Sequence, residues 1–187
     1  CPNPFYQIYE GAALLAGARV AYANSDPALN FAPRWDAIDA NTWASTQLVY
    51  VCSPGNPPGA VMNIDGWRSL FALSDRHGFV IASDECYSEI YFGHEPPLGA
   101  LQAAKALGRD TFERLIVLTS LSKRSNVPGL RSGFVAGDAA DPWPERPRKH
   151  LSQTAPIRFA ENQHVKSQAA RTQQAESGRI KVMQEQV

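Results

Sequence analysis

The sequence predicts an α/β fold with a largely parallel sheet, and two observations support this. Short apolar runs alternate with amphipathic stretches through residues 1–138, a pattern typical of strands alternating with helices. Some runs are apolar at successive positions, as in Leu48-Val49-Tyr50-Val51, because parallel strands are buried on both faces. The predicted strands are residues 19–22, 47–52, 79–83, 114–119 and 132–136.

Two helices are predicted, at residues 6–16 before the first strand and at residues 65–77 between the second and third. In the second helix the larger side chains recur every three or four positions and so share one face. They are Ile64, Trp67, Leu70 and Phe71, with Ser74 on the same face. Gly78 follows as a C-terminal stop signal, since glycine readily adopts the left-handed conformation that ends helices.

Composition excludes several classes of protein. Apolar residues make up 44% and charged residues 19% of the chain, which is ordinary for a soluble globular protein. The net charge is zero, so nothing favours binding to nucleic acid or to a membrane surface. No apolar run approaches the roughly 20 residues of a membrane helix. Three scattered cysteines predict no disulfide framework and favour the cytoplasm, and the histidines show no metal-ligand spacing.

The pattern of strands and helices stops near residue 140. Residues 141–149 hold three prolines, and the polar tail that follows has few large apolar residues. Residues 141–187 carry eight Lys or Arg against five Asp or Glu, a net charge of +3, so residues 1–140 carry −3. We therefore expect two regions, 1–140 and 141–187, the second being disordered or a frameshifted extension.

Three polar clusters each follow a predicted apolar strand. They are residues 52–59, residues 83–87, and residues 119–124 with 129–133. Ligands of open α/β sheets bind outside the carboxyl ends of the strands, so these clusters predict one shared site. Alone, each member has a plainer interpretation; Lys123 would be a solvated surface residue and Asp84 a turn residue. The joint arrangement is what indicates chemistry.

The residue types in the clusters point to pyridoxal chemistry. The Lys123 amine can form an imine with an aldehyde, and the Asp84 carboxylate can hold a protonated ring nitrogen. Arg131 and Ser120 offer a guanidinium and a hydroxyl to a phosphate.

These motifs resemble the signatures of class I/II pyridoxal-phosphate aminotransferases of fold type I. Residues 53–59 (SPGNPPG), 84–87 (DECY) and 120–123 (SLSK), with 129–133 (GLRSG), occur in the order and spacing of that family. The resemblance covers residues 1–138. It implies that residues 1–140 are part of a pyridoxal-phosphate-binding large domain with three α/β/α layers and a mostly parallel sheet.

The resemblance also implies a role for each matching residue. Lys123 would hold the cofactor as a Schiff base and then act as the catalytic acid and base. Asp84 would pair with the pyridine nitrogen, while Tyr87 and Asn56 would bind the oxygen on the cofactor ring.

Three further residues complete the predicted site. Ser120 and Arg131 would bind the phosphate of the cofactor, and Tyr6 would stack on its ring. The resemblance implies no metal. Its substrates would be an amino acid and a 2-oxo acid, and the family is homodimeric.

A finer resemblance concerns the substrate. Residues 5–12, 84–91 and 122–131 are most similar to bacterial succinyldiaminopimelate aminotransferases. This would make glutamate the amino donor and place the reaction in lysine biosynthesis.

Some features depart from the family pattern. Pro58 replaces the usual threonine of its motif, and the chain begins without methionine. We expect a fragment, because nothing matches the N-terminal phosphate-binding segment or the C-terminal domain with its substrate-binding arginine. Two alternatives therefore stay open: a non-catalytic fragment, and another fold-type I enzyme such as a different amino-acid aminotransferase or a C–S lyase.

Overall fold

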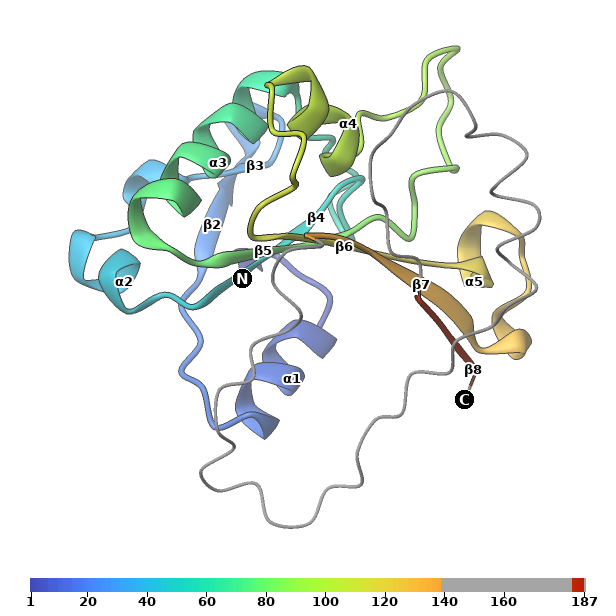
Figure 1. Cartoon of the computed structure of the whole chain (residues 1–187), viewed down its shortest axis with the longest axis horizontal. Helices are drawn as coiled ribbons and strands as arrows, with labels where there is room; N and C mark the ends of the chain where they lie inside the picture. The colour runs from blue at the N-terminus through green and yellow to red at the C-terminus, as the bar shows by residue number, and fades with distance from the viewer. Residues whose placement is uncertain (139–182, 187) are drawn as a thin grey trace.

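A five-stranded sheet forms the centre of the computed structural model, which describes residues 1–138 and 183–186 (Figure 1). Its strands are β4 (Leu48–Cys52), β5 (Val80–Asp84), β6 (Leu115–Ser120), β7 (Ser132–Gly137) and β8 (Met183–Gln186), in that spatial order. Strands β4, β5 and β6 are parallel, as predicted. Strands β7 and β8 add two antiparallel pairings, so the sheet is mixed.

Four of the five predicted strands are confirmed to within one residue at either end. The fifth prediction, residues 19–22, is wrong: the strand there is β2 (Ala23–Asp26). Its position depends on a distant partner, because β2 pairs in parallel with β1 (Pro2–Asn3) and the Ala23 amide donates to the Cys1 carbonyl at 2.8 Å. Strand β3 (Ala32–Pro33) completes this small sheet.

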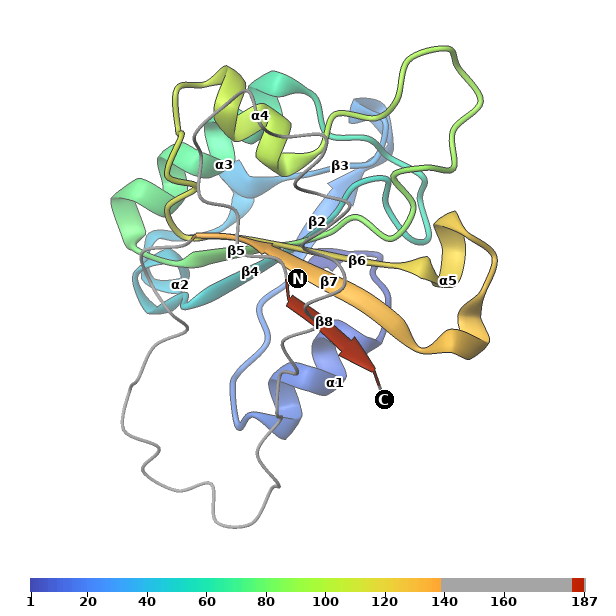
Figure 2. The same ribbon diagram turned by 45° about the vertical axis from the view of Figure 1, so that its right-hand side comes forward.

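Helices cover both faces of the central sheet. The two helices α3 (Ile64–His77) and α4 (Ala100–Ala106) lie over one face, and α1 (Ile8–Leu15) lies against the other (Figures 1 and 2). The remaining helices are short: α2 (Ala40–Ser45), α5 (Leu121–Arg124) and the 3-10 helices η1 (Pro27–Leu29), η2 (Trp35–Ala37) and η3 (Pro128–Leu130). The three predicted layers are therefore present.

Local signals at both ends define α3. The Asn63 side chain accepts a hydrogen bond from the Gly66 amide at 2.9 Å, which satisfies a free donor of the first turn. Gly78 ends the helix with φ of 77°, a conformation that costs glycine little. The predicted apolar face is confirmed, since Trp67, Leu70 and Phe71 are buried.

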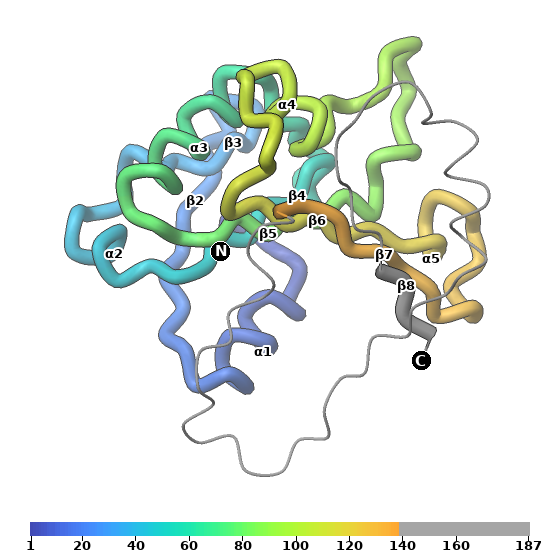
Figure 3. The backbone as a smooth tube through the Cα atoms, in the orientation of Figure 1, coloured from blue at the N-terminus to red at the C-terminus, as the bar shows by residue number. Residues whose placement is uncertain are grey.

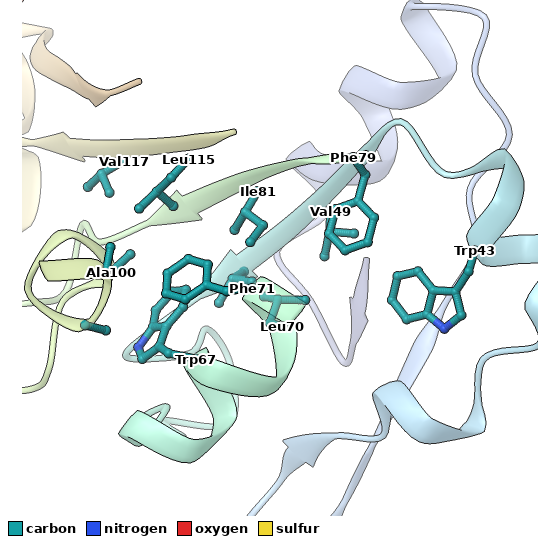
Figure 4. Close-up of a cluster of buried hydrophobic side chains, with 13 residues drawn as sticks. Trp43, Val49, Trp67, Leu70, Phe71, Phe79, Ile81, Ala100, Leu115 and Val117 are labelled. Atoms are coloured by element: carbon teal, nitrogen blue, oxygen red, sulfur yellow. The ribbon is translucent and has the colours of Figure 1, made fainter. Parts of the chain in front are cut away.

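The core lies between the sheet and α3 with α4 (Figure 4). Val49, Ile81 and Leu115 are paired across the three parallel strands and point to this face. The buried side chains of α4 are all small, Ala100, Ala103 and Ala104, so its backbone can approach the sheet closely. At one end Trp43 stacks on Phe79, with ring centroids 5.3 Å apart.

The opposite face of the same strands leads to the predicted site. Side chains alternate between faces along a strand, so Tyr50, Cys52, Asp84 and Ser120 share the face on which α1 packs. The chain leaves β5 and β6 at the same end of the sheet, beside α5 (Figure 3). Among the described residues, no helix is long and apolar enough to cross a membrane.

Replacing Leu70 in α3 tests the importance of the core. Leu70 is fully buried, so Leu70→Ala should lower the free energy of unfolding by about 2–5 kcal/mol through lost burial and the cavity left behind. The matched control is Leu15→Ala in α1, where the side chain is 86% exposed and the change should stay within about 0.5 kcal/mol. Urea denaturation of both variants gives the values; equal losses would contradict this description of the core.

Candidate functional site

Asp84 occupies the centre of the edge where the parallel strands end. It is the last residue of β5, paired with Cys52 of β4 on one side and Leu118 of β6 on the other. Both of its carboxylate oxygens accept hydrogen bonds. Oδ2 accepts from the Tyr9 hydroxyl at 2.6 Å, and Oδ1 accepts from the Cys86 amide at 3.1 Å. The carboxylate is thus held at the sheet edge by groups from two elements.

Tyr9 belongs to this site and was not predicted from the sequence. The residue is 4% exposed, and its ring stacks on Tyr50 with centroids 4.6 Å apart and planes 12° apart. Burial, followed by the hydrogen bond to Asp84, raises the pKa of Tyr9 far above its ordinary value. The hydroxyl therefore stays protonated and acts as the hydrogen-bond donor to Asp84. One signal was available: Tyr9 lies three positions after Tyr6, and residues at that spacing are neighbours on a helix.

Tyr6 lies beside this pair, two positions before α1 begins. Its ring meets the ring of Tyr9 edge to face, with centroids 6.1 Å apart. Tyr6 itself is 40% exposed, so its ring has a free surface. The structure therefore brings the predicted stacking residue next to the Tyr9–Asp84 hydrogen bond.

Cys86 and Ser120 connect Asp84 to the end of β6. The Cys86 thiol lies 3.7 Å from the Ser120 hydroxyl oxygen. Burial, and then the charge of Asp84, raise the pKa of Cys86 to about 12, so this thiol stays protonated. Ser120 is the N-cap of α5 and accepts from the Ser122 amide at 3.3 Å. Two of the three strand-end clusters, residues 83–87 and residues 119–124, are therefore in direct contact.

Lys123 and Arg131 lie in the connection between β6 and β7. Lys123 is in α5 and is exposed. Arg131 is also exposed, and its guanidinium donates to the Pro128 carbonyl at 3.1 Å. Because Ser120 pairs with Gly133 across the antiparallel strands, Arg131, which directly precedes β7, lies at the edge where β6 ends.

The turns after β4 and β5 hold the remaining predicted residues. Tyr87 is half-buried in the turn after β5, where its carbonyl accepts from the Ile90 amide at 2.9 Å. Asn56 follows β4 and lines a cavity of about 230 Å³, whose wall includes Phe5, Tyr9 and Met62. Among the predicted site residues, Asn56 alone lines that cavity, so the cavity lies beside the strand-end site.

Glu85 is a further residue that sequence patterns did not single out, and it has a structural position. Its Oε1 accepts from the Ala100 amide at 2.7 Å and from the Ser83 hydroxyl at 3.1 Å, which anchors the start of α4. A side chain at Gly99 would meet the other Glu85 oxygen at 2.9 Å. Burial raises the pKa of Glu85, and the hydrogen bond from the Ala100 amide partly opposes this.

Comparison with known proteins decides the family. The sequence profile described as aminotransferase class I and II matches residues 1–184. The chain belongs to this family. A solved aminotransferase from Neisseria meningitidis is 62% identical, with a TM-score of 0.71 over 74% of this chain and 35% of that one.

Two other relatives carry more specific names. An LL-diaminopimelate aminotransferase from Dehalococcoides mccartyi is 33% identical over 74% of this chain and 34% of its own length. A solved protein from Thermus thermophilus, described as a probable N-succinyldiaminopimelate aminotransferase, is 27% identical, with a TM-score of 0.64 over 73% of this chain and 35% of that one. The chain thus spans about a third of the length of the relatives it matches.

Pyridoxal phosphate is the cofactor of this family, and the residues at the sheet edge fit it. Asp84 presents a carboxylate fixed by two donors, which suits a protonated ring nitrogen. Lys123 presents an exposed amine one helical turn beyond β6. In the part of the chain that the structure describes, no cluster of histidine, cysteine or acidic side chains could hold a metal ion.

The raised pKa of Glu85 predicts a pH effect on stability. The unfolded carboxyl ionises near 4.5, whereas the folded one ionises at higher pH because burial disfavours the charge. The contribution of Glu85 is therefore fully present below the unfolded pKa and is lost as pH rises through the folded pKa. Glu85→Gln stays neutral, so its free energy of unfolding should rise relative to wild type from acid to neutral pH.

Urea denaturation at a series of pH values measures this difference. Glu95→Gln, on the exposed loop after β5, is the control for removing a negative charge. If the difference in free energy of unfolding between Glu85→Gln and wild type stayed constant with pH, this would contradict a raised pKa of Glu85 in the folded protein.

Proposed function

We propose that this chain supplies the cofactor site of a pyridoxal-phosphate-dependent aminotransferase, which moves an amino group between an amino acid and a 2-oxo acid. The observation that carries the proposal is the placement of Asp84. Its carboxylate is held by Tyr9 and Cys86 at the centre of the strand ends, with Lys123 directly beyond the next strand. The family match supports the same activity.

Each predicted residue has a role in this proposal. Asp84 holds the protonated ring nitrogen of the cofactor, and Lys123 holds the cofactor covalently through its Nζ. Ser120 and Arg131 bind the phosphate, for which a hydroxyl and a guanidinium are suitable donors. Asn56 and Tyr87 hydrogen-bond to the ring oxygen, and the free surface of Tyr6 stacks on the ring.

The proton transfers fall to Lys123. When bound, the cofactor supplies an electron sink for the substrate. The Nζ of Lys123 would take the proton from the substrate α-carbon and would return a proton in the second half of the reaction. Lys123 is exposed on a short helix, so its side chain can move between the cofactor and the substrate α-carbon.

The substrate in this proposal is N-succinyl-diaminopimelate, with glutamate as amino donor, in cytoplasmic lysine biosynthesis. Three segments of the sequence support it, and two of the relatives carry names that refer to diaminopimelate. The assembly in this proposal is a homodimer, as is usual for the family. A different fold-type I enzyme is the alternative.

Trapping of the cofactor tests the site. The purified chain is mixed with pyridoxal phosphate and reduced with borohydride, and peptide mapping then locates the modified lysine. We expect modification at Lys123, and its loss in Lys123→Ala. The control is Lys105→Ala in α4, which should leave the modification at Lys123 unchanged. Modification of another lysine, or of none, would contradict the assignment of Lys123.

A further inference from the structure

We propose that Tyr9 is a positioning residue for the cofactor, which acts by fixing the Asp84 carboxylate toward the ring nitrogen. This inference rests on the proposed function and adds a residue to it. Tyr9 and Asp84 are 75 positions apart in the sequence, yet their side chains meet at 2.6 Å. Tyr9 therefore acts through Asp84, without contact to the reacting atoms.

The hydrogen bonds on Asp84 determine its orientation. The Tyr9 hydroxyl donates to Oδ2, while the Cys86 amide donates to Oδ1. The Cys86 amide belongs to the same turn as Asp84, so this donor alone ties the carboxylate only to its own backbone. The donor from α1 comes from outside the turn, and together the two donors prevent rotation of the carboxylate. Lone pairs on both oxygens remain available to a ligand.

The ring of Tyr9 is itself held in place. It stacks on Tyr50 of β4 with planes 12° apart, and Tyr6 contacts it edge to face. Tyr50 pairs with Ala82, two residues before Asp84 on the neighbouring strand. Tyr50 of β4 thus supports the Tyr9 hydroxyl, and the Asp84 carboxylate lies on β5. Because β4 and β5 are hydrogen-bonded neighbours, the distance between the hydroxyl and the carboxylate is fixed.

The direction of the hydrogen bond is also fixed. The raised pKa of Tyr9 keeps its single proton on the hydroxyl, and a carboxylate can only accept. Tyr9 therefore donates to Asp84 and cannot take a proton from it. A donor on an ionised acceptor is among the stronger hydrogen bonds, and its removal costs more than that of a neutral pair.

Binding of pyridoxal phosphate to Tyr9→Phe tests this role, because phenylalanine keeps the stacked ring and removes only the hydroxyl. We expect about tenfold weaker binding, the loss typical of one hydrogen bond to a charged group, and a changed absorption spectrum of the bound cofactor. The matched control is Tyr22→Phe, which removes a hydroxyl that donates to Glu10 on the exposed side of α1. It should change the affinity by less than about twofold.

A double-mutant cycle shows whether Tyr9 acts through Asp84. In an Asp84→Ala background, or Asp84→Leu should the alanine variant fail to fold, Tyr9→Phe should have no further effect on affinity or spectrum. An equal loss of affinity in both backgrounds would overturn the proposal, as would an unchanged affinity and spectrum of Tyr9→Phe in the wild-type chain.

The same variants separate failure of this inference from failure of the proposed function. If the wild-type chain binds no pyridoxal phosphate and no lysine is trapped, the proposed function fails. Urea denaturation of the four proteins of the cycle then decides the inference: Tyr9→Phe should lower the transition midpoint in the wild-type chain and leave it unchanged when Asp84 is replaced. Equal shifts of the midpoint would show that Tyr9 does not hold Asp84.

Discussion

The pairing of three parallel strands in register is the constraint on which the rest of this structure depends. Cys52 pairs with Asp84, and Asp84 with Leu118, so β4, β5 and β6 end at one edge of the sheet. A shift of one residue in β5 would turn Asp84 toward the core and expose Ile81. The apolar core therefore opposes such a shift, because Val49, Ile81 and Leu115 would no longer be buried on the same face.

The two faces of these strands differ in function: one forms the apolar core and the other carries the polar groups of the proposed site. The face under α3 and α4 supplies burial, with Val51 and Val117 on either side of the small Ser83. On the other face, α1 contributes Tyr9, which joins the helix to the sheet through Tyr50 and Asp84. Burial on one face thus positions the polar groups of the other, and the cofactor site we propose is built from residues whose places the core determines.

The sequence predicted the parts of this structure that depend on local patterns. The strands β4, β5 and β6 are apolar at successive positions, α3 has a clear apolar face, and the polar clusters directly follow strands. Non-local contacts could not be predicted in this way. The position of β2 depends on pairing with Pro2–Asn3, and the contact of Tyr9 with Asp84 joins distant positions. The predicted tail, residues 141–187, lies outside the described residues except for β8, whose pairing with β7 is also non-local.

A crystal structure of the chain with pyridoxal phosphate would show most directly whether the cofactor binds where the ends of β4, β5 and β6 meet. We expect that electron density for the cofactor continues into the Lys123 side chain and that the ring nitrogen lies within hydrogen-bond distance of the Asp84 carboxylate. Density for the cofactor elsewhere, for instance in the apolar cavity between Phe5 and Met62, would contradict it.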